Sequence, residues 1–111
     1  AVMNRWCRLV GVGLMLIAGI AMADKPVFKL VIRDHLFYPS ELEVPVGQKF
    51  KLLIINEDTT AEEFESYELN REKVILGGKK TIIFIGPLKA GEYPFFGEFN
   101  MATAQGKIIA R

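Results

Sequence analysis

The chain has 111 residues, of which 50% are hydrophobic and 24% charged, with 14 basic and 13 acidic residues and a formal net charge of +1. This length corresponds to one domain, and the composition is that of a folded chain rather than a disordered one. The near balance of charge argues against a nucleic-acid-binding protein, which carries a clear basic excess or stripe. One Cys and one His exclude a zinc finger, a disulfide framework and an all-imidazole metal site.

Residues 1–23 have the pattern of a secretory signal peptide. Two arginines precede an apolar run over 9–20, and the small-x-small motif Ala21-Met22-Ala23 follows it. The run is shorter than the ~20 residues that a membrane-spanning helix needs. Cys7 precedes the run, which argues against a lipoprotein anchor. We therefore expect cleavage after this motif, export, and a mature chain 24–111 that has no cysteine and no membrane anchor.

Short apolar and β-branched runs recur through the mature chain, separated by Gly, Pro and Asn. This pattern predicts strands, and no window of useful length has a helical hydrophobic period. Gly77-Gly78 lies between two such runs and predicts a hairpin, because glycine adopts positive φ. The expected strands are Val27–Ile32, Glu41–Val46, Lys49–Asn56, Phe64–Leu69, Lys73–Leu76, Thr81–Ile85, Gly91–Phe96 and Lys107–Ala110.

Eight short strands in one small domain predict an all-β fold, a Greek-key β-sandwich of two sheets. If successive strands run antiparallel, every second link lies at the same end of the sandwich. The links at that end carry the only His of the chain, an acidic cluster and the segment 97–105. We therefore expect the polar residues with metal-binding chemistry to gather at one end.

The segment 57–72 contains seven acidic residues and a single basic one, Arg71. Such a charge run is most often a solvated loop. The other interpretation is a site for a hard cation, because a multivalent cation relieves the repulsion between crowded carboxylates and supplies their missing partner. Composition favours the solvated loop, whereas the expected position of the lone His at the same end favours the cation site.

Three stretches resemble the cupredoxins, and together the resemblance covers 26–111. Phe37–Gly47 matches F-x-P-x-x-L-x-V-x-x-G, Asn56-Glu57-Asp58 precedes Phe64 as in the first copper-binding stretch, and Gly91–Phe96 with Gly106–Ile109 matches G-x-Y-x-F and G-x-I-x-V. The resemblance implies a cupredoxin-like sandwich. It also implies that the blue-copper ligands are replaced, and these replacements are Glu62, Gly97 and Asn100. A blue-copper centre needs a thiolate and two imidazoles, so we expect no such centre and no blue electron-transfer function.

Two stretches, Glu62–Ser66 and Phe96–Asn100, are similar to the cupredoxin-like components of bacterial ferrous-iron uptake systems. The resemblance implies a periplasmic protein that binds copper or iron and helps to oxidise ferrous iron or to pass iron to a permease or another periplasmic iron-uptake protein. The alternative is a metal-free sandwich that docks a basic partner through its acidic end.

The candidate metal site is rich in carboxylates, which favour Fe³⁺ over Fe²⁺ and also bind Cu²⁺. On a regular strand Glu63 and Glu65 share one face and Glu62 takes the other, so all three reach one metal only if the strand is bulged. An imidazole suits Cu²⁺ and a thioether suits Cu⁺. The candidate ligands are Glu62, Glu63, Glu65, Glu98, His35 and Met101.

Overall fold

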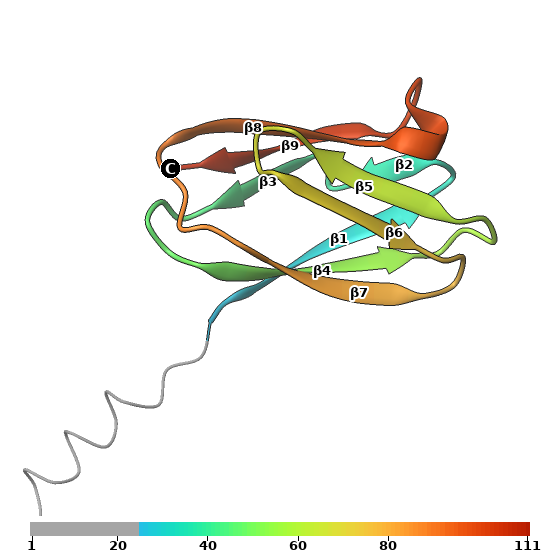
Figure 1. The fold of residues 1–111 in the computed structure, drawn as a ribbon, viewed down its shortest axis with the longest axis horizontal. Helices are drawn as coiled ribbons and strands as arrows, with labels where there is room; N and C mark the ends of the chain where they lie inside the picture. Colours follow the sequence, from blue (N-terminus) through green and yellow to red (C-terminus); the bar gives the residue numbers. More distant parts are fainter. Residues whose placement is uncertain (1–24) are drawn as a thin grey trace, which may run out of the picture.

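The computed structural model describes residues 25–111, which form nine strands and one short 3₁₀ helix, η1 (Glu98–Asn100). The strands are β1 (Val27–Arg33), β2 (Leu36–Tyr38), β3 (Glu41–Val44), β4 (Phe50–Asn56), β5 (Glu62–Ser66), β6 (Arg71–Ile75), β7 (Lys80–Ile85), β8 (Gly91–Gly97) and β9 (Gln105–Ala110). They form a four-stranded sheet in the order β2-β1-β4-β7 and a five-stranded sheet in the order β3-β9-β8-β5-β6 (Figure 1). The predicted all-β sandwich is confirmed.

The described residues contain no helix that is long and apolar enough to cross a membrane. The expected signal peptide and its cleavage point lie outside the described part of the chain.

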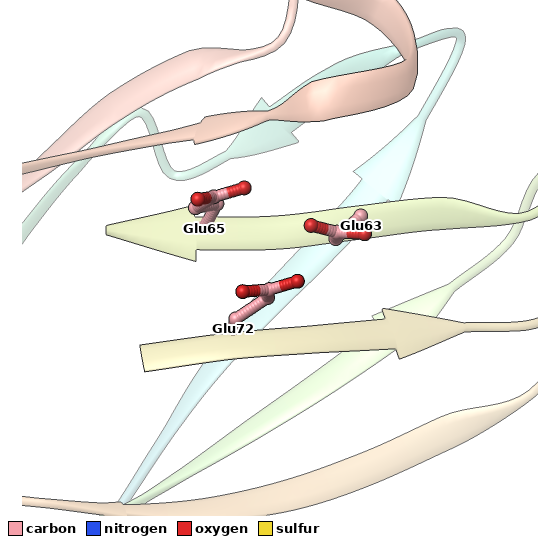
Figure 2. Close-up of side chains that lie close together, drawn as sticks. All are labelled: Glu63, Glu65 and Glu72. Atoms are coloured by element: carbon pink, nitrogen blue, oxygen red, sulfur yellow. The ribbon is translucent and has the colours of Figure 1, made fainter. Parts of the chain in front are cut away.

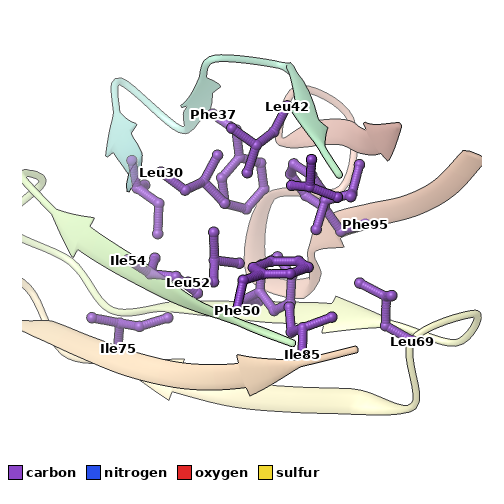
Figure 3. Packing of buried hydrophobic residues seen from close by; sticks show 14 of the residues in the cluster. Leu30, Phe37, Leu42, Phe50, Leu52, Ile54, Leu69, Ile75, Ile85 and Phe95 are labelled. Carbon is purple, nitrogen blue, oxygen red and sulfur yellow. The ribbon is translucent and has the colours of Figure 1, made fainter. Parts of the chain in front are cut away.

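The core lies between the two sheets and is formed by the inward-facing side chains of the strands, as β4 shows most clearly. Phe50, Leu52 and Ile54 of β4 are fully buried, whereas the residues between them are half-buried on the outer face. Three phenylalanines connect the sheets. The ring of Phe37 on β2 meets that of Phe95 on β8 edge-on (Figure 3), with 5.0 Å between the centroids. Phe95 in turn contacts Phe64 of β5, with 5.2 Å between the centroids. These contacts fix β5 and β8 relative to the core.

The sequence pattern missed β2 and misplaced the ends of several strands, among them β3, β5, β6 and β9. β2 has only three residues and follows Asp34 and His35, which both have positive φ, so the chain reverses directly after β1. The third strand ends at Val44, two residues earlier than expected, because Pro45 cannot donate to a ladder. β5 ends at Ser66 rather than Leu69, because the hydroxyl of Ser66 accepts the N–H of Leu69 and closes a turn.

The hairpin predicted at Gly77-Gly78 is wrong, because β6 and β7 belong to different sheets. The two glycines instead allow this link to pass close to the β4–β5 link. A Cβ on Gly77 would lie 2.1 Å from the carbonyl oxygen of Thr59. Gly78 has φ +72° and donates its N–H to the carbonyl of Asp58 at 2.9 Å. Close approach of two backbones, rather than strand pairing, requires glycine here.

Four links gather at one end of the sandwich, as the strand order predicted. The carboxylate of Asp58 accepts the N–H groups of Asp34 and His35 at 2.7 and 3.0 Å, which joins the β4–β5 link to the β1–β2 link. The hydroxyl of Thr103 donates to the carbonyl of His35 at 2.7 Å and joins the β8–β9 link. η1 belongs to this last link and lies against β5 at the same end (Figure 1).

Candidate metal centre

β5 directs its glutamates to opposite faces of the five-stranded sheet. Glu62 shares the inward face with Phe64 and is 2% exposed. Glu63 and Glu65 lie on the outer face, where antiparallel pairing places Glu72 of β6 directly opposite Glu65. Figure 2 shows these three carboxyl groups side by side across β5 and β6. The sequence-predicted glutamates of β5 therefore form two separate groups.

The carboxylate of Glu62 is bound entirely by protein groups and holds η1 against β5. Its Oε1 accepts the backbone N–H groups of Glu63 and Phe99, both at 3.0 Å, and its Oε2 accepts the side-chain amide of Asn100 at 2.7 Å. Gly97 makes room for this arrangement, since a Cβ at that position would lie 2.6 Å from Cδ of Glu62. A carboxylate with three hydrogen bonds is satisfied without a metal.

The outward group is different, because its carboxyl oxygens crowd together and no N–H or hydroxyl group of the described residues donates to them. Oxygens of Glu63, Glu65 and Glu72 lie within 4.8 Å of one another. Glu63 is 7% exposed, and its Oε1 is buried and has no hydrogen-bond partner among the described residues. A buried carboxyl oxygen without a partner is unfavourable, and either a proton or a cation corrects this.

Glu98, the first residue of η1, adds a fourth carboxyl group to this cluster. The pKa of Glu63 is raised to about 8 by three causes: its hydrogen bond with Glu98, its burial, and its hydrogen bond with Glu65. Glu98 likewise raises the pKa of Glu65, and the same two partners lower the pKa of Glu98 itself. Without a cation, Glu63 therefore keeps a proton near neutral pH, and a bound cation would replace that proton.

His35 and Met101 lie at the same end of the sandwich, and among the described residues neither forms a hydrogen bond or ion pair with the carboxylate cluster. Nδ1 of His35 lies 3.5 Å from Oδ2 of Asp58, and the His35 side chain is about half exposed. The side chain of Met101 is also about half exposed, and its backbone carbonyl accepts the amide of Gln105. Their roles as ligands stay predictions.

Glu72 belongs to the cluster, yet sequence reasoning did not select it. The signal was present in the acidic pattern on both sides of the turn at 67–70. Pairing the two flanking segments as an antiparallel hairpin, with Ser66 opposite Arg71, places Glu65 opposite Glu72.

A blue-copper centre does not fit these residues. The described residues contain no cysteine and a single histidine, His35. Glu62 and Asn100, at the positions that the cupredoxin resemblance assigns to the copper histidines, are hydrogen-bonded to each other. The oxygen-only cluster of Glu63, Glu65, Glu72 and Glu98 fits a hard cation instead.

Comparison with known proteins identifies the family. The model of the cupredoxin-like domain matches residues 7–110. The chain belongs to the cupredoxin-like family. An uncharacterized protein of Rickettsia prowazekii (strain Madrid E) is 48% identical to this cupredoxin-like chain over 81 residues, which are 73% of this chain and 65% of that protein. The cupredoxin-like chain thus spans just under two thirds of this curated relative.

Solved structures share the cupredoxin-like fold at low sequence identity. Auracyanin A, a blue copper protein from Chloroflexus aurantiacus, is 12% identical with a TM-score of 0.69, over 79% of this chain and 100% of that chain. The metal-binding domain of the Cu(I)-exporting P-type ATPase of Streptococcus pneumoniae is 12% identical with a TM-score of 0.65, over 81% and 91%. A purple cupredoxin from Nitrosopumilus maritimus is 16% identical with a TM-score of 0.58, over 79% and 100%. These likenesses establish the fold alone.

Proposed function

We propose that this cupredoxin-like protein is a periplasmic metal-binding protein that serves iron uptake. Its site is the outward cluster of Glu63, Glu65, Glu72 and Glu98, and its cation is Fe³⁺ or Cu²⁺. The observation that carries the proposal is the buried Oε1 of Glu63, which has no hydrogen-bond partner among the described residues and lies beside other carboxyl oxygens. A cation would satisfy this atom and its neighbours together.

The strand pairing adds support for a cation. Glu65 and Glu72 are directly opposite each other on β5 and β6, and like charges at such positions destabilise a sheet. A bound cation turns this repulsion into shared coordination. Glu72 and Glu98 are exposed, so an ion can reach the cluster from solvent without opening the sandwich.

Carboxylate ligands also favour the oxidation of bound iron. Anionic oxygens stabilise Fe³⁺ more than Fe²⁺, so bound Fe²⁺ gives up one electron more readily than iron in water. The electron acceptor comes from outside the chain: one O₂ takes four electrons from four Fe²⁺ and four protons from solvent, which gives four Fe³⁺ and two waters. Bound Fe³⁺ is then the form that would pass to a permease or to another periplasmic iron-uptake protein.

Metal titration of the purified protein tests the binding site. We expect Cu²⁺ or Fe³⁺ to bind at neutral pH with micromolar or tighter affinity, and Glu63→Gln with Glu72→Gln to weaken binding by about tenfold or more. Glu68→Gln is the matched control, because Glu68 belongs to the same acidic segment but not to the cluster. Absence of binding, or an equal loss in the control, would contradict the proposal.

Fe²⁺ consumption in air tests the oxidase activity. We expect the wild-type protein to accelerate the loss of Fe²⁺ and the double variant at Glu63 and Glu72 to approach the rate without protein. Equal rates for both proteins would show that the cluster does not promote oxidation.

Fractionation of cells that express the full chain tests the location. We expect the protein in the periplasmic fraction, with an N-terminus that begins after Ala23 when measured by mass spectrometry. Retention in the cytoplasm would refute export.

A further inference from the structure

We infer that the outer face of the four-stranded sheet is a docking surface for a protein partner that presents apolar side chains flanked by carboxylates. This surface lies on the sheet opposite the one that carries the glutamate cluster. The inference therefore does not depend on metal binding, and the two proposals can fail independently.

The outward positions of β2, β1, β4 and β7 carry apolar and basic side chains and no acidic one. Two of the apolar residues on the edge strand β7 are about half exposed, Ile82 at 50% and Phe84 at 47%. A contiguous apolar surface of this kind on a folded chain indicates an interaction site. The apolar positions are Val27, Val31, Leu36, Tyr38, Leu53, Ile55, Ile82 and Phe84, and the basic positions are Lys29, Arg33, Lys51 and Lys80.

Strand register places each lysine beside apolar residues. The pairs across β4 are Leu53 with Lys29 and Ile82, Lys51 with Val27 and Phe84, and Ile55 with Val31 and Lys80. Three cross-strand rows thus contain one lysine each, on three different strands. Each row therefore places one positively charged side chain next to two apolar ones.

The charges of these lysines are available to a partner. Arg33 is neutralised by Glu57, with Nε and Oε1 2.8 Å apart, at the end of the face. Lys29, Lys51 and Lys80 form no ion pair among the described residues. The free charge of the surface is therefore positive, and carboxylates on the partner would complement it.

Charge also selects among possible occupants. A second copy of this chain, docked through the same face, would bring lysines against lysines, which disfavours the pairing. A bilayer would have to accept Leu53 and Ile82 together with the adjacent lysines, because all of these side chains project from the same face of one sheet. A protein surface with apolar residues between carboxylates matches both features.

Photo-crosslinking in cells tests the inference. A benzoylphenylalanine placed at position 82 probes this face, and one placed at position 63 probes the opposite sheet. We expect position 82 to cross-link a protein at a site that contains Asp or Glu, with the yield reduced about tenfold or more by Lys29→Glu with Lys51→Glu. Changing the contacted acidic residue of that partner to Lys should restore the yield. Lys89→Glu is the matched control, because Lys89 is exposed outside this face.

Three results would overturn the inference: no cross-link specific to position 82, a cross-link that the lysine variants leave unchanged, or a cross-link to a second copy of the chain. Sedimentation with vesicles of phosphatidylglycerol and phosphatidylethanolamine provides a further test. If the wild-type protein binds these vesicles and the lysine variants do not, the surface recognises lipid and the inference is wrong. Thermal unfolding of each variant verifies that the sandwich is intact.

Discussion

Glu62 and Glu63 are neighbours on β5, yet their carboxyl groups have opposite environments. Glu62 points into the sandwich and accepts three hydrogen bonds, two of them from η1. Glu63 points to the outer face, where one of its oxygens is buried without a partner. The alternation of a strand thus separates a carboxylate that holds η1 in place from a carboxyl group with an unpartnered oxygen.

Replacing Glu62 should destabilise the fold. Glu62→Gln keeps the shape but removes the charge and presents a donor where Oε1 or Oε2 accepts a hydrogen bond. We expect a loss of about 1.5–3 kcal/mol in the free energy of unfolding, the scale of hydrogen bonds to a charged group. Urea unfolding measures this loss, with Glu68→Gln as control. Unchanged stability together with abolished cation binding would instead identify Glu62 as a metal ligand.

The stability of the metal-free protein should fall as pH rises. The pKa of Glu63 is raised from its ordinary value near 4.5 to about 8, chiefly by Glu98. Between these values the folded state binds more protons than the unfolded state, so the free energy of unfolding decreases with increasing pH. The raised pKa of Glu65 acts in the same direction. The lowered pKa of Glu98 acts in the opposite direction, and only at pH values below the ordinary pKa of a glutamate.

Urea unfolding from about pH 5 to about pH 8 measures this dependence. Glu63→Gln cannot ionise, so its stability should change much less with pH than that of the wild type. A wild-type stability that rises over this range would show that Glu63 is not protonated in the folded protein.

Much of the fold followed from local pattern. Phe50, Leu52 and Ile54 alternate with Lys51, Leu53 and Ile55. This short apolar and β-branched run predicted a strand, and the structure forms β4 there. Gly77-Gly78 misled the prediction, because a glycine pair indicates positive φ or close backbone approach without revealing which strands it separates. Only the tertiary arrangement, in which Gly77 lies against Thr59, distinguishes a hairpin turn from a close approach of two backbones.

The sequence predicted that the site is rich in carboxylates, but not which glutamates belong to it. Strand parity correctly separated Glu62 from Glu63 and Glu65. It could not show which group finds hydrogen-bond donors and which is left without them, because this depends on how η1 packs. Two of the three donors to the Glu62 carboxylate come from Phe99 and Asn100, which are more than 35 residues away along the chain. Glu72 joins the cluster because the register of β5 and β6 places it opposite Glu65. The expected strand began only at Lys73 and therefore left Glu72 out.

Cation binding should displace a proton from the cluster. At pH 7 Glu63 holds a proton, so Cu²⁺ binding should release about one proton and become tighter as the pH approaches 8. Calorimetric titrations in two buffers with different ionisation enthalpies measure the released proton. Glu72→Gln should weaken binding, while Glu68→Gln should not. Binding that is independent of pH would place the cation away from Glu63.

Gly97 should not tolerate a side chain. A Cβ at this position would lie 2.6 Å from Cδ of Glu62 and 2.7 Å from Cβ of Ala104, and neither neighbour is free to move because both are buried. We expect Gly97→Ala to cost about 1–3 kcal/mol of stability, the usual scale for overpacking.

The same substitution should also weaken cation binding, because a displaced Glu62 releases η1 and with it Glu98. Adding Ala104→Gly removes one of the two clashes and should recover part of the stability. Urea unfolding and Cu²⁺ titration of the single and double variants provide both measurements. A stable Gly97→Ala protein with unchanged affinity would show that η1 does not depend on the close contact between Gly97 and Glu62.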